Sequence, residues 1–256
     1  MRVHDLYSVE GKTAVITGAG RGIGEGIATL LAEAGANVVC ASRSTDEIEA
    51  TAQAINDSSS GGRAIFQKTD VASEDEMNAL ARRAVDEFGR LDIWVNNAGG
   101  SLVSAPLTEL PLDEWNKTLA VNLTSVFFGV RAAVPHMKQG GAIVNTSSMA
   151  AEEPFAGSAH YSAAKAGVNM MTRTLAHELG PQGIRVNTIM PGFVPTRTVK
   201  EALSMTDEDF GPLLEQLKLP AGRLGTPQDI AACVLYLVSP ASEWVTGQCL
   251  RIAGTH

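Results

Sequence analysis

The stretch 12-KTAVITGAGRGIGEGIATLLAEAGA-36 decides the fold of this chain. It opens with a short apolar run that predicts a buried strand, and it ends in a helical pattern that places Ile23, Ile27 and Leu31 on one stripe. A glycine-rich turn lies between the two. Glycines let backbone N–H groups approach a phosphate closely, and the positive N-terminus of the following helix favours an anion. We therefore expect this turn to bind a dinucleotide.

The glycines follow the pattern Thr17-Gly18-x-x-x-Gly22-x-Gly24, which differs from the usual Gly-x-Gly-x-x-Gly spacing of dinucleotide-binding turns. The alternative is a strand-to-helix turn that simply needs small residues. The position of these glycines between a first strand and a first helix favours the binding interpretation.

Apolar runs and helical patterns alternate along the whole chain. We expect strands at residues 12–18, 37–42, 63–70, 91–100, 141–148, 183–192 and 247–254, and helices at 22–36, 45–56, 73–89, 111–138, 160–179 and 226–239. Thr45 is the expected cap of the second helix, and Ser73 and Glu76 form the capping box expected at the third. Repeated strand–helix–strand units with apolar strands predict an α/β fold, a doubly wound parallel sheet of about seven strands with helices on both faces. We expect one domain spanning residues 1–256.

The composition argues against several classes of function. The net charge of −8 disfavours nucleic-acid binding, and no apolar run approaches the roughly 18 residues of a membrane span. The N-terminus lacks the apolar segment of a signal peptide. Cys40, Cys233 and Cys249 lie far apart in apolar segments, which indicates buried free thiols and a cytoplasmic protein. The five histidines show no metal-ligand spacing, so we expect no metal.

A second informative stretch is 148-SMAAEEPFAGSAHYSAAK-165. Tyr161 and Lys165 are four residues apart, so on a helix they share one face. An ammonium beside a phenol favours the phenolate and lowers the phenol pKa, which suits Tyr161 to proton transfer. Ser148 ends an apolar run, and its hydroxyl is placed to meet the same substrate oxygen. The alternative is a surface pair on an exposed helix.

The motifs occur in an ordered set along the chain. They are Thr-Gly-x-x-x-Gly-x-Gly at 17–24, Asn-Asn-Ala-Gly at 96–99, Asn122, Ser148, Tyr161-x-x-x-Lys165 and Pro-Gly at 191–192. Together they resemble the short-chain dehydrogenase/reductase family in its single-domain Rossmann form, over about residues 9 to 254. The resemblance implies an NAD(P)-dependent oxidoreductase that moves a hydride between nicotinamide and a ketone or secondary alcohol.

The resemblance also implies a role for each matching position. The catalytic residues would be Asn122, Ser148, Tyr161 and Lys165, with Tyr161 as general acid or base and Asn122 holding a water that links Lys165 to solvent. The cofactor would contact Gly18, Gly20, Arg21, Gly22, Ile23, Gly24, Ser42, Arg43, Asp70, Val71, Asn97, Ala98, Gly99, Tyr161, Lys165, Pro191, Gly192, Val194 and Thr196. The alternative for Asp70 and Val71 is a strand-end turn, and the alternative for Asn97 is a mainly structural role.

The second strand ends in Ser42-Arg43-Ser44, with no acid before Asp46. A carboxylate at this point usually accepts hydrogen bonds from the ribose 2′-OH of the non-phosphorylated cofactor. Arg43 instead offers a guanidinium fork suited to a 2′-phosphate, and Arg21 offers a second positive charge. We therefore expect NADP(H) to be preferred over NAD(H). The alternative is that both arginines are solvated surface residues.

The substrate stays open at this point. A free ketone or a cyclic or steroid-like alcohol is favoured over a 3-oxoacyl thioester on acyl carrier protein or CoA, because Gln139 and Gln182 stand where carrier-dependent relatives often show Arg or Lys. A dinucleotide-binding regulatory protein without catalysis is the alternative from another class. Residues 193–221 are expected to form a substrate lid.

The family resemblance further implies a homotetramer. Its interfaces would be the last helix and strand and the helix faces within 111–138 and 160–179. The chain departs from the family at its end, where Ile252-Ala253-Gly254-Thr255-His256 lacks the Asp of a frequent Asp-Gly-Gly.

Overall fold

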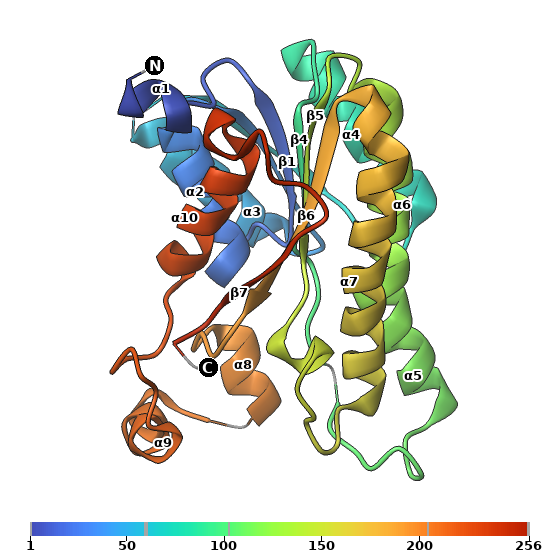
Figure 1. The fold of residues 1–256 in the computed structure, drawn as a ribbon, viewed down its shortest axis with the longest axis vertical. Coiled ribbons are helices and arrows are strands. Elements are labelled where there is room, and N and C mark those ends of the chain that lie inside the picture. Colours follow the sequence, from blue (N-terminus) through green and yellow to red (C-terminus); the bar gives the residue numbers. More distant parts are fainter. Residues whose placement is uncertain (1, 59–60, 102, 204, 255–256) are drawn as a thin grey trace.

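A computed structural model describes residues 2–58, 61–101, 103–203 and 205–254. Within these residues, seven strands form one sheet in the order β3-β2-β1-β4-β5-β6-β7, with every neighbouring pair parallel (Figure 1). The strands are β1 (Thr13–Thr17), β2 (Asn37–Ser42), β3 (Ala64–Lys68), β4 (Ile93–Asn96), β5 (Gly141–Thr146), β6 (Ile184–Pro191) and β7 (Cys249–Ile252). The strand order reverses between β1 and β4, where Ala14 pairs with Ile93. The predicted doubly wound parallel α/β sheet is confirmed.

Helices cover both faces of the sheet. One face carries α2 (Gly22–Glu33), α3 (Thr45–Asp57) and α10 (Pro227–Val238), and the other carries α4 (Glu74–Phe88), α6 (Ser125–Ala133) and α7 (Ala159–Leu179). Outside these layers lie α1 (Val3–Tyr7), α5 (Leu112–Leu119), α8 (Arg197–Leu203) and α9 (Phe210–Leu217). Short 3₁₀ turns occur at η2 (Val134–His136), η3 (Met149–Ala151), η4 (Gly180–Gln182), η5 (Asp207–Asp209) and η6 (Pro240–Ser242).

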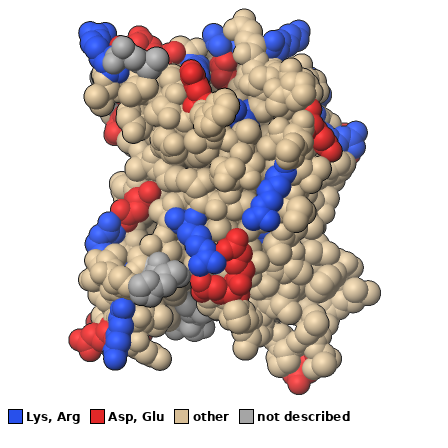
Figure 2. All heavy atoms as spheres, viewed as in Figure 1, with Lys and Arg blue, Asp and Glu red and all other residues tan. Residues whose placement is uncertain are grey.

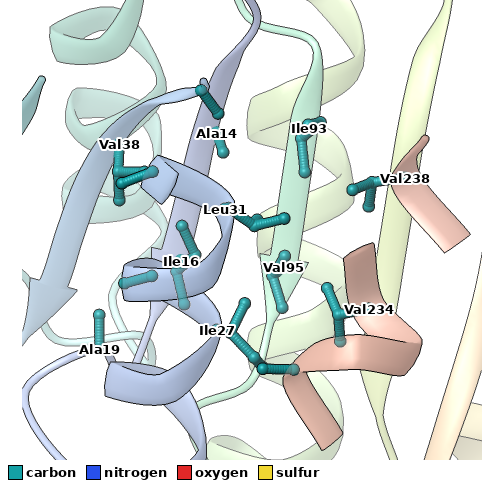
Figure 3. Packing of buried hydrophobic residues seen from close by; sticks show 14 of the residues in the cluster. Ala14, Ile16, Ala19, Ile27, Leu31, Val38, Ile93, Val95, Val234 and Val238 are labelled. Carbon is teal, nitrogen blue, oxygen red and sulfur yellow. The ribbon is translucent and has the colours of Figure 1, made fainter. Parts of the chain in front are cut away.

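Alternate residues of the central strands point into two separate cores. Ala14 and Ile16 of β1 pack with Ile27 of α2 and Val234 of α10 on one face (Figure 3). Val15, between them, points into the core of the other face. Because both faces are buried, the three central residues of β1 are all apolar, rather than alternately apolar and polar. This is why its sequence reads as an unbroken apolar run.

The helix expected over residues 111–138 is divided into parts. A π-helical segment, η1 (Ala120–Thr124), separates α5 from α6, and η2 ends the run. Contrary to the expectation that no apolar run approaches a membrane span, Leu112–His136 has the length and the mean hydropathy, 1.3, of one. A core helix of a soluble protein passes the same test, and here α6 packs on α4 and β4 while α5 packs on α7. Both helices of the segment therefore pack against other elements of the fold.

The predicted helix caps are only partly correct. The Ser73 hydroxyl accepts a hydrogen bond from the Glu76 backbone N–H, as expected. The Glu76 carboxylate does not close the box, because it accepts from the Asp70 backbone N–H at 2.7 Å instead. Thr45 is not the cap of α3. Thr45 is instead the first residue of the helix, and Ser44 occupies the cap position without a side-chain cap bond.

The segment from Phe193 to Gly225 leaves the sheet and returns to it. The Gly225 N–H donates to the Phe193 carbonyl at 3.0 Å, so the two ends of the segment meet. Between them lie α8, η5 and α9, beyond the carboxyl ends of the strands (Figure 1). The Phe193 and Phe210 rings contact edge to face at 6.0 Å between centroids. Ser204, within the expected lid, is outside the described residues.

Candidate active site

One cavity of about 390 Å³ follows the carboxyl ends of the strands from the glycine turn to Ser148 and Tyr161. It crosses the point between β1 and β4 where the strand order reverses, which is where open α/β sheets bind ligands. Every predicted cofactor residue lines it, as do Ser148 and Lys165, whereas Asn122 does not. The lining also includes residues that sequence reasoning had not assigned to the site: Ser44, Glu47, Thr69, Gly100, Val121, Thr146, Ser147, Thr198 and Val199.

The glycine turn forms a cradle that a side chain would fill. Gly18 has φ +68°, a left-handed conformation that favours glycine. A Cβ atom on Gly24 would lie 2.0 Å from the Gly18 carbonyl oxygen, so α2 could not approach β1 with any other residue there. The first residues of α2, Gly22, Ile23 and Gly24, all line the cavity, so the positive end of this helix borders it. The pyrophosphate of a dinucleotide fits this cradle.

Asn97 ties the glycine turn to the end of β4. Its side-chain amide donates to the Thr17 carbonyl at 3.0 Å, and its backbone N–H and that of Ala98 each donate to the Thr17 hydroxyl at 3.0 Å. Thr17 is buried, so these bonds fix the spacing between β1 and β4. The side chain of Asn97 is thus engaged in holding the two strand ends that flank the cavity.

Glu47 of α3 lines the same end of the cavity as Arg43, and this carboxylate was not predicted from the sequence. Arg43 is exposed, lines the cavity and belongs to none of the ion pairs found among the described residues. Arg21 instead pairs with Glu47 of α3 at 3.6 Å and with Glu201 of α8 at 3.8 Å. The only signal for Glu47 was an acid in the first turn of the second helix, a common place for one. Arg21 is therefore shared between carboxylates before any ligand binds.

Lys165 is buried beside the predicted acid. Its Nζ atom donates to the Thr146 carbonyl at 2.7 Å and lies 5.6 Å from the centroid of the Tyr161 ring. The Ser147 hydroxyl donates to the Lys165 carbonyl at 3.0 Å and so fastens α7 to the end of β5. Burial lowers the pKa of Lys165 to about 8, because the protein interior disfavours the ammonium. Tyr161 and Lys165 do share one helix face, as predicted.

The predicted fall in the Tyr161 pKa is wrong for the protein without ligand. Burial raises the pKa of Tyr161, and a hydrogen bond with the Ser148 side chain opposes this only in part. The ammonium of Lys165 lies over the ring rather than at the hydroxyl, so it does not stabilise the phenolate enough to reverse the direction. The Ser148 hydroxyl also accepts from the Ala150 backbone N–H at 3.2 Å.

Asn122 lies in the π-helical segment, and its side chain is fully used by backbone groups. Its oxygen accepts from the Gly100 N–H at 2.9 Å, and its amide nitrogen donates to the carbonyls of Gly100 and Thr118, each at 3.0 Å. A Cβ atom on Gly99 would lie 2.7 Å from the Asn122 oxygen and 3.3 Å from the Lys165 Nζ. The side chain therefore positions the loop that separates Asn122 from Lys165. Such π segments often mark functional sites.

The end of β6 is held against the last strand. The Gly192 N–H donates to the Ile252 carbonyl at 2.9 Å, and the Thr196 N–H donates to the Val194 carbonyl at 2.7 Å. Arg251 of β7 pairs with Glu152 and Glu153, which follow Ser148 in the chain. Of the terminal stretch Ile252–His256, which lacks the Asp of the family pattern, Thr255 and His256 are outside the described residues.

The remaining titratable groups offer little other chemistry. Among the residues that the structure describes, no three His, Cys, Asp or Glu side chains gather as metal ligands do. Cys40 is buried, whereas Cys233 and Cys249 are only half-buried, unlike the prediction. Burial raises the pKa of Cys40 to about 12 and that of Cys233 to about 11, which keeps both thiols protonated.

Comparison with known proteins agrees with this geometry. The model of a family described as Enoyl-(Acyl carrier protein) reductase matches residues 18–254. The 3-oxoacyl-[acyl-carrier-protein] reductase FabG of Vibrio cholerae is 38% identical over 249 residues, which are 96% of this chain and 98% of the relative. The 7alpha-hydroxysteroid dehydrogenase of Escherichia coli is 38% identical over 255 residues, 98% of this chain and 96% of the relative. A solved 7 alpha-hydroxysteroid dehydrogenase, complexed with NADH and 7-oxo glycochenodeoxycholic acid, matches with TM-score 0.90 and 37% identity, over 99% of this chain and 97% of that one.

The chain belongs to the short-chain dehydrogenase/reductase family. The family predicted from the ordered motifs is thereby confirmed. As a short-chain dehydrogenase/reductase, the protein is an oxidoreductase that acts on CH–OH or ketone groups. Relatives in this family bind NAD(P) dinucleotides, and the cradle at the glycine turn fits that class of cofactor.

Proposed function

We propose that this protein is an NADP(H)-dependent reductase of ketones, or dehydrogenase of secondary alcohols, with Tyr161 as the general acid or base. The observation that carries the proposal is the placement of Ser148, Tyr161 and Lys165 in the same cavity as the glycine turn. The bound dinucleotide would supply the hydride, and the protein would supply orientation and proton transfer. A dinucleotide at the glycine turn and a substrate at Ser148 and Tyr161 can react only if both sets of residues line the same cavity.

The proposed roles follow from where charge develops. As the carbonyl carbon is reduced, its oxygen gains negative charge and needs hydrogen-bond donors and a proton. Ser148 and Tyr161, which line the same cavity, would both reach that oxygen. Lys165 would hold a ribose hydroxyl and stabilise the phenolate left on Tyr161. Asn122 would keep the Gly100 loop in place and leave room for a water next to Lys165.

The preference for NADP(H) is part of this proposal. Arg43 is the cation at the end of β2 that the described carboxylates leave unpaired, so its guanidinium is available to a 2′-phosphate. Glu47 runs against the preference, because its carboxylate also lines the adenosine end. The pairing of Glu47 with Arg21 at 3.6 Å and Arg197 at 3.3 Å offsets that negative charge.

The favoured substrate class is a free apolar ketone or alcohol, such as a cyclic or steroid-like compound. One loop, residues 103–109, follows Gly100 of the cavity wall, and another, residues 152–158, lies in the chain between Ser148 and Tyr161. The two loops are joined by a hydrogen bond from the Ala105 N–H to the Gly157 carbonyl at 3.0 Å. Each loop leaves a large apolar side chain in solvent, Leu107 and Phe155, which are 58% and 52% exposed. Exposed apolar side chains on loops next in the chain to the site suit an apolar ligand.

A 3-oxoacyl thioester remains the second candidate, supported by the likeness to the Vibrio cholerae enzyme. An acidic carrier protein needs a positive landing surface. On the face in Figure 2, positive and negative side chains are interspersed and no broad positive area stands out. Gln139 and Gln182 are exposed but uncharged. These features favour the free ketone or alcohol.

A substrate screen tests the proposal. The purified protein is assayed by the change in nicotinamide absorbance with NADPH or NADP⁺ and a panel of cyclic ketones, hydroxysteroids, 3-oxoacyl-CoA thioesters and a 3-oxoacyl carrier protein. We expect turnover with cyclic or steroidal compounds and weak turnover with the carrier-bound thioester. Efficient turnover of the carrier-bound compound alone would favour the second candidate. No turnover of any compound, with dinucleotide bound, would support a binding protein without catalysis.

We further propose that residues 193–221 act as the lid, that the protein is a homotetramer and that it works in the cytoplasm. The lid proposal rests on the segment that leaves the sheet at Phe193 and returns at Gly225. The tetramer proposal rests on apolar side chains left in solvent on the helices expected at an interface, Phe127 of α6 and Met170 of α7, which are 43% and 58% exposed.

A further inference from the structure

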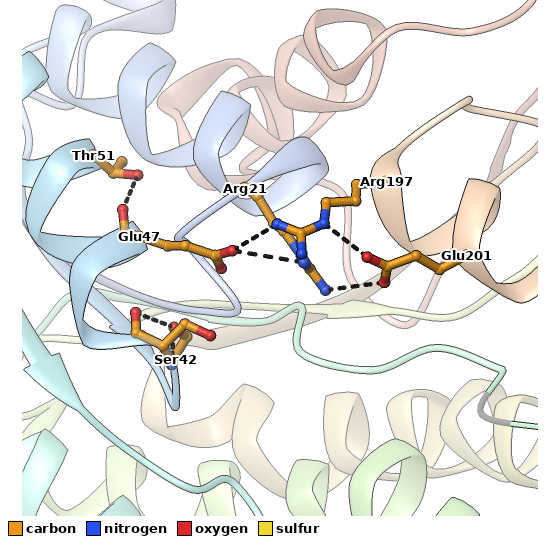
Figure 4. A network of polar contacts seen from close by, with 7 residues as sticks. Arg21, Ser42, Glu47, Thr51, Arg197 and Glu201 are labelled. Carbon is orange, nitrogen blue, oxygen red and sulfur yellow. Dashed lines mark hydrogen bonds and ion pairs between the residues drawn. The ribbon is translucent and has the colours of Figure 1, made fainter. Parts of the chain in front are cut away.

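Four charged side chains form a closed network at the mouth of the cavity. Arg21 lies in the glycine turn, Glu47 in the first turn of α3, and Arg197 and Glu201 on α8 (Figure 4). Arg197 pairs with Glu201 at 2.7 Å and with Glu47 at 3.3 Å. Arg21 pairs with the same two carboxylates at 3.6 Å and 3.8 Å. Each arginine thus contacts both glutamates, and the network is neutral overall.

The network spans the cofactor site rather than lying beside it. A Cβ atom on Gly20 would lie 2.7 Å from the Glu47 Cβ, so α3 packs directly on one side of the glycine turn. A Cβ atom on Gly22 would lie 3.1 Å from the Thr196 Cγ2, so the start of the lid packs on the other side. Arg21 and Glu47 line the cavity, whereas Arg197 and Glu201 do not.

The two arginines are not held equally. The contacts of Arg197 are shorter than those of Arg21, and Arg197 and Glu201 are also one helical turn apart on α8. A competing anion can therefore draw Arg21 out of the network at a smaller cost in free energy than Arg197. The 2′-phosphate of NADP(H) is such an anion, and it enters the end of the cavity that Arg21 and Arg43 line.

We propose that Glu47 and Glu201 are specificity-determining residues, because they compete with the 2′-phosphate for Arg21 and so couple cofactor choice to the attachment of the lid. This inference rests on the proposed binding of NADP(H) in the cavity. Binding of NADP(H) draws Arg21 away from Glu201 and loosens α8. Binding of NAD(H) leaves the network intact. By linkage, any change that weakens the hold of the lid on Arg21 favours the phosphorylated cofactor.

The network predicts opposite effects for its two lid residues. Glu201→Gln removes a competitor for Arg21, so the affinity for NADPH relative to NADH should rise by roughly two- to fivefold, the size expected of an exposed ion pair. Arg197→Met leaves two carboxylates facing Arg21 alone, so the same ratio should fall. Neither residue touches the cavity, and both act through Arg21.

The experiment measures dissociation constants of NADPH and NADH by fluorescence titration of the full chain. The variants are Glu201→Gln, Arg197→Met, Arg21→Met and the double variant Arg21→Met/Glu201→Gln. Glu208→Gln is the matched control, because Glu208 is exposed on the same segment and belongs to none of the ion pairs among the described residues. Hydrogen exchange of residues 197–203 in the cofactor-free protein reports the lid independently of any ligand.

We expect a higher NADPH-to-NADH affinity ratio and faster exchange of residues 197–203 in Glu201→Gln. We expect neither effect in Glu208→Gln, and no effect of Glu201→Gln on the ratio once Arg21 is replaced. If Glu201→Gln raises the NADPH-to-NADH affinity ratio by the same factor in Arg21→Met as in the parent, the charge of Glu201 acts at a distance and not through Arg21. That result would overturn the inference. So would unchanged ratios while both dinucleotides still bind. A parental protein that binds neither dinucleotide would overturn the proposed function as well.

Discussion

The ammonium nitrogen of Lys165 lies 5.6 Å from the ring centroid of Tyr161, on the same face of α7. The ammonium is fixed there by the Thr146 carbonyl, to which it donates at 2.7 Å. Burial raises the pKa of Tyr161 above its ordinary value, although a hydrogen bond with the Ser148 side chain acts in the opposite direction. A phenol of that kind holds its proton until a substrate oxygen with growing negative charge takes it, which is what ketone reduction requires.

The first prediction concerns Tyr161→Phe. The change removes the proton donor and keeps the ring, so turnover should fall by roughly 10²- to 10⁴-fold while dinucleotide affinity stays close to that of the parent. Steady-state rates and fluorescence titration measure the two quantities. Tyr236→Phe on α10 is the matched control, because Tyr236 is half-buried outside the cavity. If Tyr161→Phe retains more than about a tenth of the parental turnover, Tyr161 is not the general acid.

The second prediction concerns the stability of Lys165→Met as a function of pH. Burial lowers the pKa of Lys165 from 10.5 to about 8, so the folded state disfavours the ammonium. Between these values the unfolded chain binds a proton that the folded chain has lost, and stability therefore rises with pH in this window. The penalty is present in full below pH 8 and gone above pH 10.5.

Lys165→Met removes that penalty, which is on the order of 3 kcal/mol before the lost hydrogen bond to Thr146 is subtracted. Urea unfolding should show the variant more stable than the parent at pH 7, with a difference that shrinks as pH rises from 8 toward 10.5. The exposed Lys138→Met serves as control and should show no such trend. A pH-independent difference for Lys165→Met would contradict the lowered pKa.

The third prediction concerns Arg43→Ala. If Arg43 binds the 2′-phosphate through a charge-assisted hydrogen bond, kcat/KM with NADPH should fall about ten- to hundredfold, and kcat/KM with NADH should change little. Arg131→Ala, on α6 and away from the cavity, makes the same charge change as a control. A parent that prefers NADH, or an unchanged ratio in Arg43→Ala, would show that the phosphate is not recognised here.

The fourth prediction concerns the lid. Hydrogen exchange should slow in α8 and α9 when substrate binds to the protein that already holds cofactor, because closure over the substrate would exclude water from the reaction. Strands β1 and β4, which are buried in the sheet, should show no change and provide the internal reference. Strong and equal protection of residues 193–221 in the free and the bound protein would speak against a lid.

The fifth prediction concerns assembly. Light scattering at micromolar concentration should give four times the 26.9 kDa mass of the chain. Met170→Lys places a charge on an exposed apolar position of α7 and should reduce the mass to that of a dimer, because the α10 and β7 surface is unaffected. A monomeric parent would refute the tetramer, and a tetrameric variant would exclude Met170 from its interfaces.

Local patterns in the sequence were enough to predict the sheet and the cofactor turn. The apolar runs of the strands, the glycines at 18, 22 and 24 and the four-residue spacing of Tyr161 and Lys165 depend on neighbours within one turn of helix or one strand. For the same reason, the helix faces and the end of α7 near Leu179 were found close to their observed positions.

The charges and polar partners around the site were decided only by tertiary structure. Glu47 and Arg197 pair across 150 positions of sequence, and Asn122 and Gly100 across 22, so no local pattern could join them. The direction of the Tyr161 pKa was also misjudged, because burial depends on the elements packed around α7 and not on Lys165 alone. Sequence by itself determined which elements form and where the dinucleotide turn lies, through short-range periodicity and glycine geometry. The three-dimensional packing decided which charges meet over that turn and how strongly each buried group is desolvated.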